Sequence, residues 1–193
     1  NTVRDQSFQY EGIENAGNLG IPHWFTPQAF HWGAARQHHP FRTYRYPSEE
    51  EMRSLNLAAA IYNAKGFLFY SYADVRLQEE KLDPANGKMF WNSVRGVSSL
   101  LRELEPWIMS VEKAPETAVV PKHAGKAKVI ARAFSSHGKT AVLIVSNGPG
   151  AAEAVVTVPG CPALKSKYGH TRNLGDGKYL FTGENIASDV LLP

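Results

Sequence analysis

Two short stretches of the sequence carry amide, hydroxyl, carboxylate and aromatic side chains at alternate positions. These side chains belong to Trp24, Thr26, Gln28, Tyr70, Tyr72 and Asp74. Side chains two positions apart in a strand share one face, so each stretch would present its set together. Amides and carboxylates form paired hydrogen bonds with sugar hydroxyls, and flat rings stack on the apolar face of a sugar. The pattern therefore predicts a carbohydrate-binding surface.

The aromatic candidates have structural alternatives. Trp32, just beyond the first stretch, is a candidate sugar platform or a ring buried beneath a loop. Tyr70 lies within an apolar run, which favours the core over the site. For Tyr72 the two interpretations are evenly balanced.

The polar candidates are also open to a second interpretation. Gln28 would contact a ligand at the end of a strand or bond the backbone there. Asp74 would contact a ligand, pair with Arg76 or cap a loop. Arg45 could line the same cleft, but a pair with Glu49 at the start of a helix is the preferred prediction.

Histidines are concentrated in the loop after the first stretch. The cluster comprises His31, Gln37, His38 and His39. It lacks an adjacent carboxylate and the fixed spacing of a helical metal site, so a solvated loop is favoured over a metal centre. We expect no metal and no cofactor, and we retain His31 as a sugar-contacting candidate.

Composition excludes several classes of protein. The 193 residues carry 21 Lys and Arg against 18 Asp and Glu, a net charge of +3 that is too small for a nucleic-acid footprint. The sequence contains no apolar stretch of about 18 residues, so we expect no membrane span. The single cysteine, Cys161, is interpreted as a structural thiol.

The first part of the chain alternates between strand and helix patterns. Residues 20–26 and 66–72 are aromatic and apolar runs that predict strands, the second covered on both faces. Ser48, followed three residues later by Glu51, predicts a helix start, and a second helical stripe covers residues 89–108. This alternation indicates parallel βαβ units.

The pattern changes after residue 111. Residues 129–134 and 140–147 predict a β-hairpin, and further short strands separated by glycine, proline and asparagine predict an antiparallel sandwich. We therefore expect two domains, residues 1–112 and residues 113–193.

This order resembles the end of a glycoside hydrolase: the last units of a (β/α)8 barrel followed by an all-β accessory domain. The resemblance is carried by residues 21–30 (IPHWFTPQAF), 44–53 (YRYPSEEEMR) and 64–72 (AKGFLFYSY), and by 145–147 (VSN) and 188–193 (SDVLLP). The first three are similar to strand seven, the helix after it and strand eight. The expected fold is thus a partial barrel of two to three βα units plus a small antiparallel β-sandwich.

The resemblance implies a function, and it implies that the chain is a fragment of a longer protein. A barrel needs eight strands and roughly 250 residues, so six units would be missing, and we expect self-association or a partner chain that carries them. It implies a secreted or periplasmic protein that hydrolyses or binds glycans. Gln28 stands where such enzymes place the nucleophile, and an amide is not a nucleophile. The catalytic carboxylates are therefore unknown, and this chain alone should be inactive.

Two other interpretations remain open. One is a non-catalytic carbohydrate-binding or interaction module, and the other is the end of a different α/β hydrolase or synthase. All four tryptophans precede residue 112, so the β-rich part lacks a tryptophan platform and is expected to be structural, with Tyr168 and Tyr179 as weaker candidates.

Overall fold

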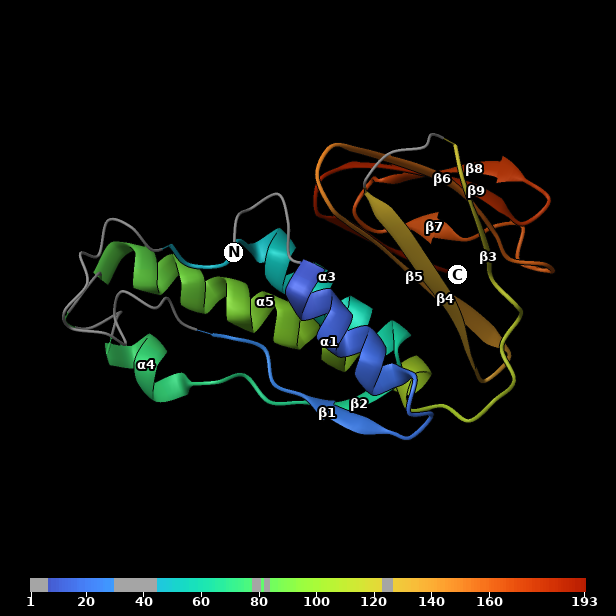
Figure 1. Cartoon of the computed structure of the whole chain (residues 1–193). Coiled ribbons are helices and arrows are strands. Elements are labelled where there is room, and N and C mark those ends of the chain that lie inside the picture. The colour runs from blue at the N-terminus through green and yellow to red at the C-terminus, as the bar shows by residue number, and fades with distance from the viewer. Residues whose placement is uncertain (1–6, 30–44, 78–80, 82–83, 123–126) are drawn as a thin grey trace.

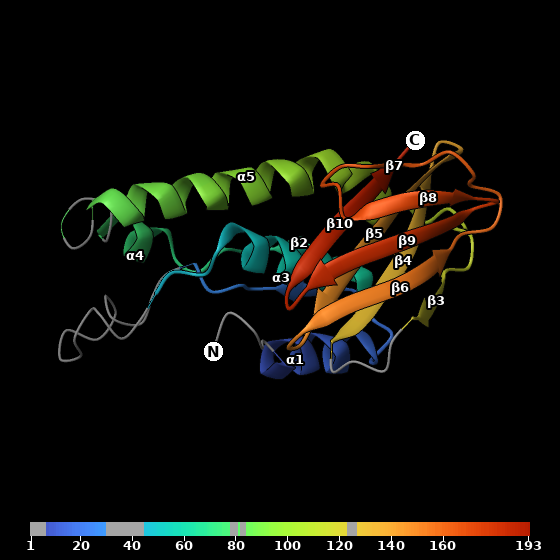
Figure 2. The same ribbon diagram turned by 90° about the horizontal axis from the view of Figure 1, so that it is seen from above.

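The computed structural model describes residues 7–29, 45–77, 81, 84–122 and 127–193. A layer of helices lies between a short two-stranded ribbon and two larger sheets (Figure 1). The first part of the chain contains α1 (Ser7–Gly17), β1 (His23–Phe25), α3 (Glu49–Ile61), β2 (Ala64–Phe67), α4 (Tyr72–Leu77) and α5 (Pro84–Ile108). Figure 2 shows α3 between α1 and α5, and α3 contacts both of these helices.

Helix α3 begins where the sequence predicted a helix. The Ser48 hydroxyl accepts a hydrogen bond from the Glu51 amide, and the Glu51 carboxylate accepts one from the Ser48 amide, which completes a capping box. Every residue from Glu51 to Ile61 is buried. This burial follows because α3 packs against β2 on one side and against the larger sheets on the other.

Strands β1 and β2 pair in parallel, as predicted. Each is shorter than the apolar run that predicted it. Backbone bonds nevertheless continue the pairing, with Leu68 N donating to Phe25 O at 3.0 Å and Tyr70 N to Pro27 O at 3.2 Å. Phe25 and Phe67 pack against the cluster of buried residues that includes α3.

The remaining strands form two antiparallel four-stranded sheets. Their orders are β4-β5-β10-β7 and β3-β6-β9-β8. The strands are β3 (Ala118–Pro121), β4 (Lys128–Ser136), β5 (Lys139–Asn147), β6 (Ala151–Thr157), β7 (Lys165–Ser166), β8 (Thr171–Gly175), β9 (Lys178–Glu184) and β10 (Ala187–Leu192). The predicted hairpin is confirmed as β4–β5. Its turn residues His137 and Gly138 both have positive φ, at 50° and 70°, as a two-residue turn between twisted strands requires.

The sheet that contains β5 is buried on both faces. Val142 and Ile144 face the other sheet, in a cluster with Tyr179 and Phe181. Leu143 and Val145 belong instead to the cluster that contains the helices. This double burial explains why residues 141–145 form a continuous apolar run rather than an alternating one.

The predicted partial (β/α)8 barrel is wrong. The described residues form four helices, two antiparallel four-stranded sheets and one two-stranded parallel pair, with no closed barrel and no series of barrel units. The resemblance to the end of a glycoside hydrolase barrel is therefore also wrong. The alternation of strand and helix patterns predicts the order of the elements along the chain, but it does not predict which surface each helix covers. Helix α3 covers β5 and β10 as well as β2, in a mixed α/β fold.

None of the described helices combines the length and the apolar character that crossing a bilayer would need.

Candidate functional site

The β1–β2 ribbon has one face against the helices and one face open to solvent. On the open face Trp24 is 75% exposed, Leu68 57% and Tyr70 58%. Thr26 is also exposed and Gln28 is partly exposed, whereas the intervening Phe25, Pro27 and Ala29 are more buried. We call the open side the outer face; its residues are Trp24, Thr26, Gln28, Gly66, Leu68 and Tyr70. The predicted two-residue alternation thus holds for Trp24, Thr26 and Gln28.

Trp24 lies across the neighbouring strand. A Cβ placed on Gly66 would be 2.6 Å from Trp24 Cδ2, so the indole occupies the space that any larger residue would fill. Glycine at this position therefore allows the ring to lie against the backbone of β2. The result is a large flat apolar surface held in place by its support.

Gln28 and Tyr70 lie opposite each other across the parallel pair. They form an isolated parallel bridge, and Ala29 N donates a hydrogen bond to Tyr70 O at 2.5 Å. The structure therefore brings together two candidates from stretches about forty residues apart in the sequence. The preferred placement of Tyr70 in the core is wrong, because no described layer covers the outer face.

Tyr72 and Asp74 lie beyond the strand pair, in α4. The Tyr72 ring packs against Trp91 of α5, with centroids 5.4 Å apart and planes tilted by 58°, and the residue remains 57% exposed. Asp74 accepts a hydrogen bond from the Ser71 hydroxyl, and its own amide donates to that hydroxyl at 3.3 Å. Ser71 therefore caps the start of α4, and the Asp74 carboxylate, in the first turn, is held against the Ser71 hydroxyl.

Two of the predicted site residues, His31 and Trp32, lie outside the described residues, as do Gln37, His38 and His39. Within the described part of the chain, no group of three or more His, Cys, Asp or Glu side chains could hold a metal ion.

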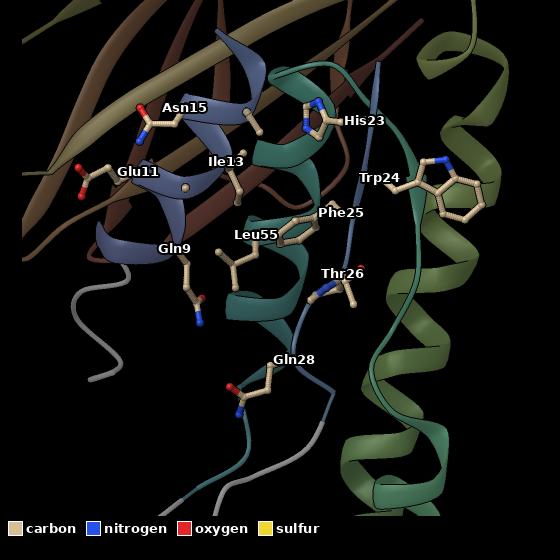
Figure 3. Close-up of a pocket in the computed structure, with 13 residues that line it drawn as sticks. Gln9, Glu11, Ile13, Asn15, His23, Trp24, Phe25, Thr26, Gln28 and Leu55 are labelled. Atoms are coloured by element: carbon tan, nitrogen blue, oxygen red, sulfur yellow. The ribbon is translucent and has the colours of Figure 1, made fainter. Parts of the chain in front are cut away.

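A cavity of about 530 Å³ runs along β1 on the side of α1 (Figure 3). Phe25 and Leu55 point toward its interior, and Gln9 and Gln28 extend at one end. Sequence reasoning missed the contribution of α1, because a short helix with mixed polarity showed no pattern tied to β1. The lining residues of α1 are Gln9, Glu11, Gly12, Ile13, Asn15 and Ala16.

Two carboxylates near this region, Glu14 and Glu51, are engaged in structural contacts. Glu14 pairs with Lys128 of β4 at 3.0 Å, and the hydrogen bond from Lys128 lowers the pKa of Glu14. Arg45 forms two hydrogen bonds of 2.6 Å to Glu51, so the predicted pair with Glu49 is wrong. Arg45 pairs with Glu51 rather than with Glu49 because the capping position of Glu51 turns its carboxylate back toward the residues before the helix.

Burial raises the pKa of Glu51, but the bonds from Arg45 and from the Ser48 amide outweigh it, and the net direction is downward. Glu51 is thus held as a paired carboxylate. The outer face offers rings, an amide and a hydroxyl instead, which suit stacking and hydrogen bonding.

Comparisons of the chain with models of protein families, with curated proteins and with solved structures found no match.

Proposed function

We propose that this chain is a non-catalytic carbohydrate-binding module that holds a glycan on the outer face of the β1–β2 ribbon. The observation that carries the proposal is the Trp24 indole, 75% exposed and supported against Gly66, with Tyr70 exposed on the same face. Because its contact with β2 already holds the ring in place, a ligand that stacks on it loses little binding free energy to ordering the side chain.

The chemistry of the surrounding residues fits a sugar. The apolar face of a pyranose ring can stack on Trp24 or Tyr70, and its hydroxyls can bond the Gln28 amide and the Thr26 hydroxyl. Gln28 and Tyr70 face each other across the strand pair, so one sugar residue can reach both. Carboxylate chemistry is not needed for this role.

The test is binding of soluble cello-, xylo-, chito- and malto-oligosaccharides, measured by tryptophan fluorescence and isothermal titration calorimetry. We expect at least one series to bind, and Trp24→Ala to weaken that binding by about tenfold, the equivalent of one aromatic stacking contact. Trp107→Phe is the matched control, because Trp107 lies in α5 and donates to Lys139 O at 3.3 Å, away from the outer face. Trp107→Phe should bind as the unmodified chain does.

Gly66→Ala provides a finer test. An added methyl group would displace the Trp24 ring from its support without removing it. We expect weaker oligosaccharide binding with the indole still present. Absence of binding by all four series, or equal binding by Trp24→Ala, would contradict the proposal.

A further inference from the structure

A second cavity, of about 340 Å³, lies beside β4, and we call it the β4 cavity. It is lined by Lys65 of β2, Arg132 of β4, the end of α5 and the segment that joins α5 to β3. The chain is described without interruption through each of these segments, over residues 45–77, 84–122 and 127–193. The β4 cavity shares no lining residue with the cavity beside α1, so it is a separate place in the fold.

Two cationic side chains of the β4 cavity are each anchored to the last residue of a helix. Lys65 Nζ donates to the carbonyl oxygen of Ile108, where α5 ends. Arg132 Nη1 donates to the carbonyl oxygen of Ile61, where α3 ends, at 2.9 Å. The partial negative charge at a helix C-terminus favours both contacts. These bonds hold the two cations in place, so a ligand would lose little binding free energy to ordering them.

The anchoring bonds leave donor groups for a further acceptor. An ammonium carries three N–H groups and a guanidinium five. The bond to Ile108 is the one hydrogen bond of the Lys65 ammonium to a described residue, and the bond to Ile61 is the corresponding one of the Arg132 guanidinium. Most of the N–H groups therefore have no acceptor within the described part of the chain.

The two cations also lack a counter-charge among the described residues, since neither forms an ion pair there. Two glutamates line the same cavity, but Glu112 accepts hydrogen bonds from two backbone amides of the β4–β5 turn, and Glu116 is exposed. Burial and the nearby charge of Arg132 lower the pKa of Lys65. Like charges in a partly desolvated site favour an anion between them.

The size and the lining of the cavity indicate which anion fits. A water molecule accounts for about 30 Å³ of liquid, so the cavity exceeds the space that a halide ion needs. The hydroxyls of Ser110 and Ser135 and the ring of Trp107 belong to the same lining. A guanidinium binds two oxygens of one oxyanion through its planar fork, and an ammonium adds a point charge.

We propose that the β4 cavity binds a phosphate group, with Lys65 and Arg132 donating to its oxygens. The group is either inorganic phosphate or the phosphate of a small monoester, and both present the same oxygens to the two cations. This site does not depend on the proposed glycan site, because Trp24 and the rest of the outer face contribute nothing to it.

The test titrates the unaltered chain with inorganic phosphate and with glycerol 3-phosphate, against sodium chloride of equal ionic strength. Two-dimensional NMR of backbone amides reports where each ligand acts. We expect saturable shifts with a Kd below about 10 mM, centred on Lys65, Arg132 and residues 110–117 and absent with chloride. Tighter binding of glycerol 3-phosphate would identify a monoester as the source, and tighter binding of phosphate would identify the free ion.

Substitution of each cation tests its role. Lys65→Met and Arg132→Met should each weaken phosphate binding by about tenfold, the equivalent of one lost hydrogen bond to a charged group. The matched controls are Lys165→Met and Arg172→Met, because these exposed residues lie on β7 and β8, the strands at the opposite edges of the two sheets from β4 and β3. Each control, and Trp24→Ala, should change the affinity by less than about twofold.

Three results would overturn the proposal. They are the absence of saturable shifts up to about 100 mM phosphate, far above useful affinities; the same shifts with chloride; and unchanged affinity of Lys65→Met and Arg132→Met, with circular dichroism showing both to be folded. Shifts centred outside the β4 cavity in the unaltered chain would also overturn it, and this measurement stands even where a variant does not fold.

Discussion

Arg53 joins the helical layer to the sheets through a buried polar cluster. It is 8% exposed, and its Nε donates to Ser188 Oγ of β10 at 3.1 Å. Its guanidinium also pairs with Glu50 and lies 3.8 Å from the centroid of the Tyr168 ring. Ser188 Oγ in turn donates to Glu50 Oε1 at 2.8 Å. Removal of Arg53 would therefore leave the Glu50 carboxylate without its cationic partner and remove the bond that Ser188 Oγ accepts from Arg53 Nε.

The expected cost of Arg53→Ala follows from these contacts. Breaking a buried ion pair by removing one partner costs about 3 to 5 kcal/mol. The Glu50 side chain is 29% exposed, which lets water replace part of the lost interaction and places the expected loss near 3 kcal/mol. For a chain of this length, such a loss lowers Tm by roughly 6 to 12 °C.

The assay is urea unfolding at pH 7, followed by circular dichroism and by tryptophan fluorescence. Arg95→Ala is the matched control, because Arg95 is an exposed arginine of α5; it should change stability by less than about 0.5 kcal/mol. Arg53→Lys should recover part of the loss, since it keeps the charge but not the planar fork. If Arg53→Ala destabilised the chain no more than Arg95→Ala does, the cluster would not hold the layers together.

Two further predictions concern pH and backbone conformation. The pKa of Glu51 is lowered in the folded chain, because bonds from Arg45 and Ser48 outweigh the effect of burial; its contribution to stability is therefore present above the ordinary glutamate pKa of about 4.3 and is lost as pH falls through the lower folded value. Glu51→Gln should lower the urea midpoint at pH 7 and reduce it much less at pH 3, and an equal reduction at both would contradict the assignment. Gly177 has a φ of +71°, and a Cβ there would overlap the Val158 carbonyl oxygen, so Gly177→Ala should cost about 3 kcal/mol. Gly138→Ala, at a φ of +70° with open space around it, should cost about 1 kcal/mol in the same unfolding assay; similar costs for the two variants would show that the overlap is relieved.

Elements specified by neighbouring residues were predictable. The start of α3 followed from Ser48 and Glu51, and the β4–β5 hairpin from two apolar runs around a short turn. The shared face of Trp24, Thr26 and Gln28 followed from the two-residue period of a strand. In each case the interacting atoms lie within a few residues of one another or obey a fixed backbone period.

Contacts between distant segments were not predictable in the same way. The sequence suggested that Arg45 pairs with Glu49, but the capping geometry directs it to Glu51. The role of α1 beside β1 depends on packing that no local pattern encodes. The exposure of Tyr70 likewise depends on whether another layer covers the ribbon.

The sequence by itself determined the start of α3, the β4–β5 hairpin and the parallel pairing of β1 with β2, because capping, turn conformation and hydrophobic period are local properties of the chain. The tertiary structure decided which surfaces those elements bury. Helix α3 packs against a parallel ribbon on one side and an antiparallel sheet on the other. An apolar stripe specifies that a helix must be covered, but not by what, and the barrel prediction failed for that reason.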